Sequence, residues 1–266
     1  MKIKHLLSVG LYLLSLFSCA SEKEDNALLA ANSPGEMVSV PAGKFMMGCV
    51  GGDSNCQPNE KPYHEVVLDA YSIDKHEVTV SEYVACILAG KCTNPNSGYG
   101  CNFGIADRKK HPVNCVDWSQ AKAYCEFAGK RLPTEAEWEK AARGTDGRIY
   151  PWGNTSPTCN YAVMNEGNAG CGRNSTWDVC SKTSGNSPYG ACDMAGNVWE
   201  WVADWYSESY YTSAAVSNPQ GPGSGQYRVL RGGSWFYIND GLRASYRLIN
   251  VPSIWDYYFF GFRCAR

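Results

Sequence analysis

The chain has 266 residues, a formal net charge of −2 and a pI near 6.1, with 44% hydrophobic and 19% charged residues. This length and composition suit one globular domain with a sizeable core. Acidic and basic residues are interspersed rather than gathered in blocks, so the sequence lacks the basic stripe typical of nucleic-acid binding and no nucleic-acid partner is expected.

The N-terminus has the pattern of a secretory signal peptide. Two lysines precede an apolar run over 6–17, and Ser18 separates this run from Cys19. The run is shorter than the roughly 20 apolar residues that span a bilayer. We expect a lipoprotein signal peptide over 1–18 and a lipid on Cys19, which places the protein in the bacterial cell envelope, at the outer membrane or cell surface. Cleavage elsewhere, leaving a free protein, is the alternative.

Residues 19–36 are polar, charged or small, which is typical of a flexible tether. Apart from Cys19, the chain has twelve cysteines, an even number. In an exported protein this number favours disulfides, because the compartment oxidises thiols. Only four histidines are present, so a structural zinc cluster is not expected.

Short strands are predicted in the first part of the domain. Alternating apolar residues over 37–47 indicate a strand pair that turns at Pro41. The alternation over 64–73 indicates one half-buried strand.

Three helices follow, each with a start signal. Thr79 and Asp117 are suited to cap the first two, and Thr134 with Glu137 forms the capping box of the third. The helices are expected over 80–89, from Asp117 to Gly129, and from Pro133 to Gly144.

Glycine, asparagine, proline and cysteine interrupt the chain after Thr145, and only 198–201, 227–230 and 260–264 have the character of strands. The expected class is α+β, with few helices, short strands and many loops held by disulfides. No internal repeat or second-domain linker is present.

Eight sequence blocks occur in a characteristic order. They read PAGKFMMG at 41–48, KHEVT at 75–79, PVN and VDW within 112–118, GKRLPTEAEWE at 129–139, YPWGN at 150–154, DMAGNVWEW at 193–201, RGGSW at 231–235 and GFRC at 261–264. Together they resemble the sulfatase-modifying factor family, whose founding member is the formylglycine-generating enzyme. The resemblance covers 37–266 and implies that enzyme's variant of the C-type lectin fold.

The enzyme of that family oxidises a substrate cysteine with two cysteines of its own, which follow the Gly-Gly-Ser motif and hold copper. Soft thiolate ligands select copper(I), and hydroxyl or amide groups do not replace them. The matching interval here, 232–262, contains no cysteine. We therefore expect no copper and assign no catalytic residue.

The resemblance also implies a disulfide between Cys125 and Cys264, and a second family disulfide is missing because Ala142 and Ala244 occupy its positions. Short loop closure favours pairing the other ten cysteines with their neighbours, although sequence leaves their connectivity open. These pairs are Cys49 with Cys56, Cys86 with Cys92, Cys101 with Cys115, Cys159 with Cys171, and Cys180 with Cys192.

A calcium site is a further implication of the resemblance. The matching positions are Asp193, Gly196, Val198 and Glu200, which would supply carboxylates and backbone carbonyls. Such oxygen donors suit a hard cation. A structural Ca²⁺ is the one cofactor that we expect.

Residues 231–266 hold ten aromatic residues among asparagine, serine and aspartate, a mixture typical of paratopes. The segment is similar to the variable segment of target proteins of diversity-generating retroelements, some of which are lipoproteins with this fold. The alternative is that these aromatics rebuild a core after the cysteines were lost. The candidate ligand-binding residues are Tyr237, Asn239, Asp240, Tyr246, Trp255, Asp256, Tyr257 and Tyr258.

Three functions remain open. The first is a non-catalytic surface lipoprotein that binds a protein or glycan ligand through its C-terminal loops. The second is an enzyme of the family that oxidises protein cysteine to formylglycine or has another activity. The third is a structural envelope lipoprotein.

Overall fold

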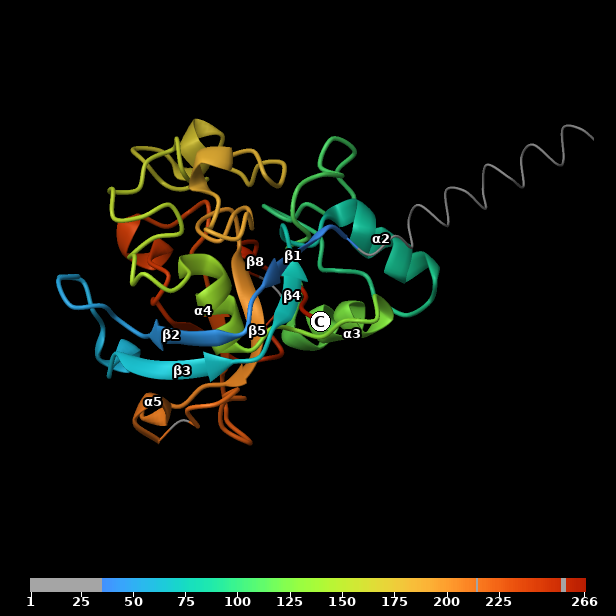
Figure 1. Ribbon diagram of the computed structural model, residues 1–266. Helices are drawn as coiled ribbons and strands as arrows, with labels where there is room; N and C mark the ends of the chain where they lie inside the picture. The colour runs from blue at the N-terminus through green and yellow to red at the C-terminus, as the bar shows by residue number, and fades with distance from the viewer. Residues whose placement is uncertain (1–34, 214, 255–256) are drawn as a thin grey trace, which may run out of the picture. The chain divides into compact units, whose positions relative to one another are not determined.

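The computed structural model describes residues 35–213, 215–254 and 257–266, and it consists of short strands and few helices joined by long loops (Figure 1). The expected fold class is confirmed. The signal peptide over 1–18, Cys19, nearly all of the tether, Trp255 and Asp256 lie outside the described residues. No helix in the described part of the chain is long and apolar enough to cross a membrane.

The N-terminal strands form two separate antiparallel ladders. Strand β1 (Met37–Val40) pairs with β4 (Tyr71–Asp74), and β2 (Gly43–Met47) pairs with β3 (His64–Leu68). The predicted pairing within 37–47 and the single strand over 64–73 were therefore wrong. The exposed residues Asp69 and Ala70 separate β3 from β4. There the Asp69 N–H donates to the Asn218 side chain at 2.9 Å and takes no part in a strand ladder.

Three helices begin as their sequences predict. Helices α2 (Val80–Leu88), α3 (Trp118–Phe127) and α4 (Glu135–Arg143) each start with a capping box, in which the cap and the third residue satisfy each other's backbone N–H groups. Gly144 ends α4 with φ 70°, a conformation that glycine adopts readily. A short helix, α5, spans Tyr210–Ser213.

A four-stranded sheet forms the second half of the fold. Strand β5 (Trp199–Trp205) is flanked by β6 (Arg228–Arg231), antiparallel to it, and by β8 (Phe260–Phe262), parallel to it. Strand β7 (Leu248–Asn250) extends the sheet beyond β6. Helix α4 lies alongside β5, whereas α2 and α3 lie together near the C-terminus (Figure 1). Single 3-10 turns occur at Pro58–Glu60, Ala169–Gly172, Thr183–Gly185 and Asn239–Leu242.

Buried ion pairs join α4 to the C-terminal segment. The guanidinium of Arg247 binds both oxygens of Glu135 at 2.7 and 2.9 Å, and Arg231 binds Glu139 at 2.6 Å. Arg143 also binds Glu139, at 2.8 Å. All five side chains are nearly inaccessible to solvent. We call them the ion-pair frame: because each buried charge has a partner, the frame fixes the C-terminal segment to α4.

Candidate functional site

The segment after β6 leaves the sheet through two glycines in the left-handed region. Gly232 has φ 95° and Gly233 has φ 80°, and a side chain at Gly233 would meet the Gly241 carbonyl oxygen at 2.9 Å. The Trp235 N–H then donates to the Asn197 carbonyl at 2.9 Å. The Trp235 carbonyl in turn accepts from the Gly170 N–H at 2.7 Å. The backbone that begins the candidate site is therefore held from both sides.

Aromatic side chains beyond this point form a connected group of rings, and the exposed Ile238 follows Tyr237 in the chain. Trp235 contacts Phe236 edge-on, and Phe259 lies against Phe236 and Tyr257 with centroid separations of 6.4 and 5.3 Å. Tyr258 packs between Trp235 and Tyr99, with both separations at 5.6 Å. We define the aromatic face by the members that are partly or fully exposed: Tyr99, Phe236, Tyr237, Ile238, Tyr257, Tyr258 and Phe259.

The most exposed members of the aromatic face carry no hydrogen-bonding group or carry one only at the tip. The exposed fraction is 47% for Phe236, 60% for Ile238, 38% for Tyr257 and 76% for Tyr99. Large apolar side chains that remain in water on backbone held in place are typical of an interaction site.

The candidate ligand-binding residues divide into two groups. Asn239, Asp240 and Tyr257 are exposed. Tyr237 and Tyr246 are half-buried and lie against Trp199, at 5.1 and 5.7 Å between centroids. Tyr258 is also half-buried.

Burial raises the pKa of Tyr237, and its neighbours Tyr246 and Tyr257 raise it further. Tyr237 and Tyr246 thus pack against the buried Trp199, and Tyr237 connects that core residue to the exposed part of the aromatic face. Tyr99 was missed because it lies far from the C-terminal interval, in a loop between Gly98 and Gly100.

Every cysteine among the described residues is in a disulfide. The long-range bridge joins Cys125 in α3 to Cys264 with 5.6 Å between their Cα atoms, and the other five join the neighbouring pairs named above. The residues of the C-terminal interval thus include no thiol, and they do not fit a copper ion.

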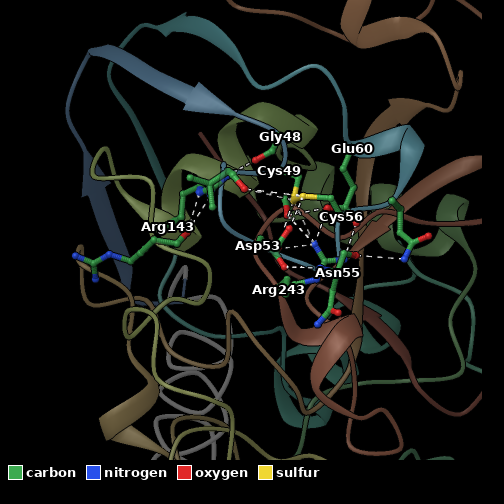
Figure 2. Close-up of a disulfide and its surroundings, with 12 residues drawn as sticks. Gly48, Cys49, Asp53, Asn55, Cys56, Glu60, Arg143 and Arg243 are labelled. Atoms are coloured by element: carbon green, nitrogen blue, oxygen red, sulfur yellow. Dashed lines mark hydrogen bonds and ion pairs between the residues drawn. A yellow bond between two sulfur atoms is a disulfide. The ribbon is translucent and has the colours of Figure 1, made fainter.

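One cluster of possible metal ligands occurs in the described part of the chain, formed by Cys49, Asp53 and Cys56. Figure 2 shows that the two sulfurs are bonded to each other and that Asp53 faces Arg243, at 3.0 Å. Arg243 also binds Glu60 through two hydrogen bonds of 2.6 Å. The cluster is a disulfide-closed loop over a buried ion pair, and its ligand atoms are already committed.

The positions matched to a calcium site lie in a buried acidic region. Both oxygens of Glu200 accept hydrogen bonds from Arg263 at 2.7 Å, and one also accepts from the Trp138 indole at 2.7 Å. Asp193 is buried, with φ 53°, and accepts from the Cys180 N–H. The side chain of Glu200 is therefore occupied, and Asp193 is the more available of the two carboxylates.

Sequence reasoning missed a third acid, Glu77, which is fully buried in the same region. One of its oxygens accepts from the Val198 N–H at 3.4 Å and the other from the Asn197 amide at 3.3 Å. Burial raises the pKa of Glu77 well above its ordinary value, and the charges of Asp193 and Glu200 raise it further.

Burial also raises the pKa of Asp193, to about 6. Of the three buried carboxylates in this region, Glu200 binds Arg263 directly, whereas Glu77 and Asp193 make no ion pair in the described part of the chain. The carboxylate oxygens of these three residues are not all gathered within 4.8 Å of one another. A structural Ca²⁺ at Asp193, Gly196, Val198 and Glu200 stays a prediction, and Glu77 is a further buried carboxylate in the same region.

Comparison with known proteins agrees with this geometry. Residues 23–266 match the family described as "Sulfatase-modifying factor enzyme 1-like domain". The chain is 34% identical to the formylglycine-generating enzyme of Streptomyces coelicolor, with 93% of this chain and 94% of that protein covered. It is 36% identical to the serine/threonine-protein kinase pkn1 of Chlamydia pneumoniae, where the match covers 87% of this chain but spans only 38% of the kinase.

A solved structure with the same fold is that of Treponema denticola variable protein 1. It is 29% identical, has a TM-score of 0.68, and the match covers 86% of this chain and 94% of that one. On the family match over most of its length and on the fold, the chain belongs to the sulfatase-modifying factor family.

Proposed function

We propose that the protein is a non-catalytic binding protein that recognises a protein or glycan ligand through its aromatic face. The observation that carries this proposal is the exposure of Phe236, Ile238 and Tyr257, the first of which directly follows Trp235, whose N–H and carbonyl are both hydrogen-bonded to neighbouring segments. A preorganised apolar surface loses little conformational entropy on binding, which favours affinity.

The cysteine chemistry supports binding rather than oxidation. A family oxidase uses two thiols of its own after the Gly-Gly-Ser motif, and here that interval carries none while the other described cysteines are in disulfides. The similarity to the Treponema variable protein supports a surface that differs between related copies. We extend the proposal to ligand-binding residues in the segment 236–258, including Trp255 and Asp256.

Enzymatic activity is the second candidate, because the Streptomyces formylglycine-generating enzyme matches nearly the whole chain. Incubation of the purified protein with copper, oxygen and a cysteine-containing sulfatase peptide tests it. Aldehyde formation on the peptide, detected by mass spectrometry, would contradict the non-catalytic proposal.

Two substitutions on the aromatic face, Phe236→Ala and Ile238→Ser, test the binding proposal directly. The protein is screened against a phage-displayed random peptide library and a glycan array. We expect the double variant to lose the binders that the unaltered protein selects. Leu88→Ser is the matched control, because Leu88 is also an exposed apolar residue, on α2. Selected binders that bind the double variant equally well would contradict the proposal.

We also propose that Cys19 carries a lipid and anchors the protein to the cell envelope, at the outer membrane or cell surface. Globomycin, which blocks lipoprotein signal cleavage, should accumulate the uncleaved precursor. Processing that is unaltered by globomycin would remove the anchor from the proposal.

A further inference from the structure

Five cationic side chains gather beside the aromatic face and form what we call the basic rim: Arg108, Lys109, Lys110, Arg173 and Lys182. Eleven other lysines and arginines of the described residues pair with carboxylates. None of the five rim cations has an ion pair with a carboxylate in the described part of the chain. Their charges are therefore available to a partner.

Contacts between two loops hold the basic rim together. The guanidinium of Arg173 and the ammonium of Lys182 both lie over the ring of Trp177, 3.7 and 4.0 Å from its centroid. The Val179 N–H donates to the Lys110 carbonyl at 3.0 Å, so the loop that contains Arg108, Lys109 and Lys110 runs beside the Trp177 loop. Cation–π contacts of this kind position the cations without neutralising them.

Carboxylates within the rim only partly compensate its charge. Asp178 lies 3.5 Å from the imidazole of His111, and Asp107 is also close to this imidazole. Burial lowers the pKa of Lys182, and the charge of Arg173 lowers it further. The five cations outnumber the three acids that act on this region, Asp107, Asp178 and the buried Asp193, and leave a positive surface in a protein whose net charge is −2.

Hydrogen bonds connect the loops that carry the basic rim to the loops that carry the aromatic face. The Trp177 indole donates to the Gly170 carbonyl at 2.9 Å, and the Gly170 N–H donates to the carbonyl of Trp235, which precedes Phe236. On the other side, the Asn174 amide donates to the Tyr99 hydroxyl at 3.2 Å. The loops of the rim and of the face are thus joined at two places.

We propose that the basic rim binds acidic residues of a protein ligand whose apolar side chains occupy the aromatic face; this inference rests on the proposed binding function. A protein is favoured over a neutral glycan because acidic side chains complement the unpaired cations of the rim, and apolar side chains complement Phe236 and Ile238. An apolar centre with a charged edge is the usual anatomy of a protein–protein interface. Complementary charge at such an edge contributes to specificity and association rate.

Panning of a phage-displayed random peptide library on the purified protein tests the inference. Selected peptides should combine aromatic or aliphatic residues with aspartate and glutamate. For one synthesised acidic peptide, Arg173→Gln with Lys182→Gln should weaken binding about tenfold at low ionic strength. The difference should shrink as salt is added, because salt screens exposed charges.

Two further variants separate charge from folding. Lys109→Gln with Lys110→Gln removes the same charge without touching the Trp177 ring, and should weaken binding of the acidic peptide in the same direction. Lys61→Gln with Lys91→Gln is the matched control, because both lysines are exposed and lie outside the rim. This control should bind the peptide as the unaltered protein does.

The outcomes distinguish the inference from the function on which it rests. Peptides that depend on Phe236 and Ile238 but show no acidic bias would overturn the inference and leave the binding function standing. Retention on heparin that is lost in the rim variants, without acidic peptides, would assign the rim to an anionic glycan and also overturn it. No selected peptide and no glycan-array signal would contradict the binding function itself.

Discussion

The ion-pair frame and the aromatic face reverse the usual distribution of side chains. The frame buries Glu135, Arg231 and Arg247 with almost no exposed area, whereas the face leaves Phe236 and Ile238 in water. Charges inside are costly unless each has its partner, so the frame tolerates little change. Exposed side chains touch few neighbours, so the face can change at little cost. A rigid interior that carries a replaceable exterior suits a binding protein with differing ligands.

The largest expected effect comes from breaking the frame at Glu135. Burial alone would raise the pKa of Glu135, but Arg247 and Arg231 outweigh it and lower that pKa. Glu135→Gln leaves Arg247 without its counter-charge and should reduce the free energy of unfolding by about 3–5 kcal/mol in urea titrations. Glu65→Gln, which breaks only an exposed pair with Lys44, should cost less than about 1 kcal/mol. Equal losses in the two variants would contradict this comparison.

A second prediction concerns the acidic region beside the frame. If Asp193 and Glu77 hold Ca²⁺, adding the ion to chelator-treated protein should stabilise it by about 2.7 kcal/mol when the free ion is at 100 times its dissociation constant. Thermal unfolding measures the effect. Asp193→Asn should abolish the calcium-dependent rise in Tm, and the exposed control Asp107→Asn should retain it. A Tm that is insensitive to Ca²⁺ in the unaltered protein would remove this ion from the site.

A third prediction uses Asp204, a buried acid of β5. Its side chain accepts a hydrogen bond from the N–H of Glu135, the first residue of α4, at 2.7 Å. Burial raises its pKa to about 8, and the charge of Glu135 adds to the rise. The folded state therefore keeps the proton in the range from about pH 4 to 8, where the unfolded chain has lost it.

This group's contribution to stability is thus fully present below about pH 4 and disappears as the pH rises through 8. Asp204→Asn should make the stability profile flatter over this window, by at most about 1.4 kcal/mol per pH unit. Urea titrations at several pH values measure the slope. The same slope in both proteins would show that Asp204 does not retain a proton in the fold.

The smallest expected effect on stability comes from substitutions on the aromatic face. Ile238→Ser should change the free energy of unfolding by no more than about 0.5 kcal/mol, the size usual for surface substitutions. Phe236→Ala should cost at most about 1.5 kcal/mol, because Phe236 contacts the rings of Trp235 and Phe259. The measurement is urea unfolding of the same variants that are used for binding. A collapse in stability would show that these side chains belong to the core and not to a binding surface.

Features with local causes could be predicted from the sequence. Helix α4 begins after Thr134 because that side chain and Glu137 satisfy each other's backbone, and both residues are neighbours in the chain. Pairing of β1 with β4 and of β2 with β3 could not be predicted in this way. The apolar patterns of 37–47 and 64–73 indicate strands but do not select partners, and packing in three dimensions makes that choice.

The candidate site shows the same limit. Composition indicated an aromatic C-terminal surface, yet Tyr237 and Tyr246 turn toward Trp199 while Phe236 and Ile238 face water. Residue type does not determine which way an irregular loop directs its side chains. Tyr99 joins the face from a distant loop, which no local pattern could reveal.

By itself the sequence determined the helix starts, the even set of disulfide-forming cysteines and the lack of cysteine after the Gly-Gly-Ser motif, because each depends on residue identity and short spacing. Only the tertiary structure decided which cations have no carboxylate partner among the described residues and which aromatic rings reach the surface. Arg108 and Arg173 are ordinary charges in a mixed sequence, and they form one rim with Lys182 because the fold brings two loops together around Trp177. Charge and apolar surface act over a few ångströms of space, and a folded chain sets those distances without regard to sequence separation.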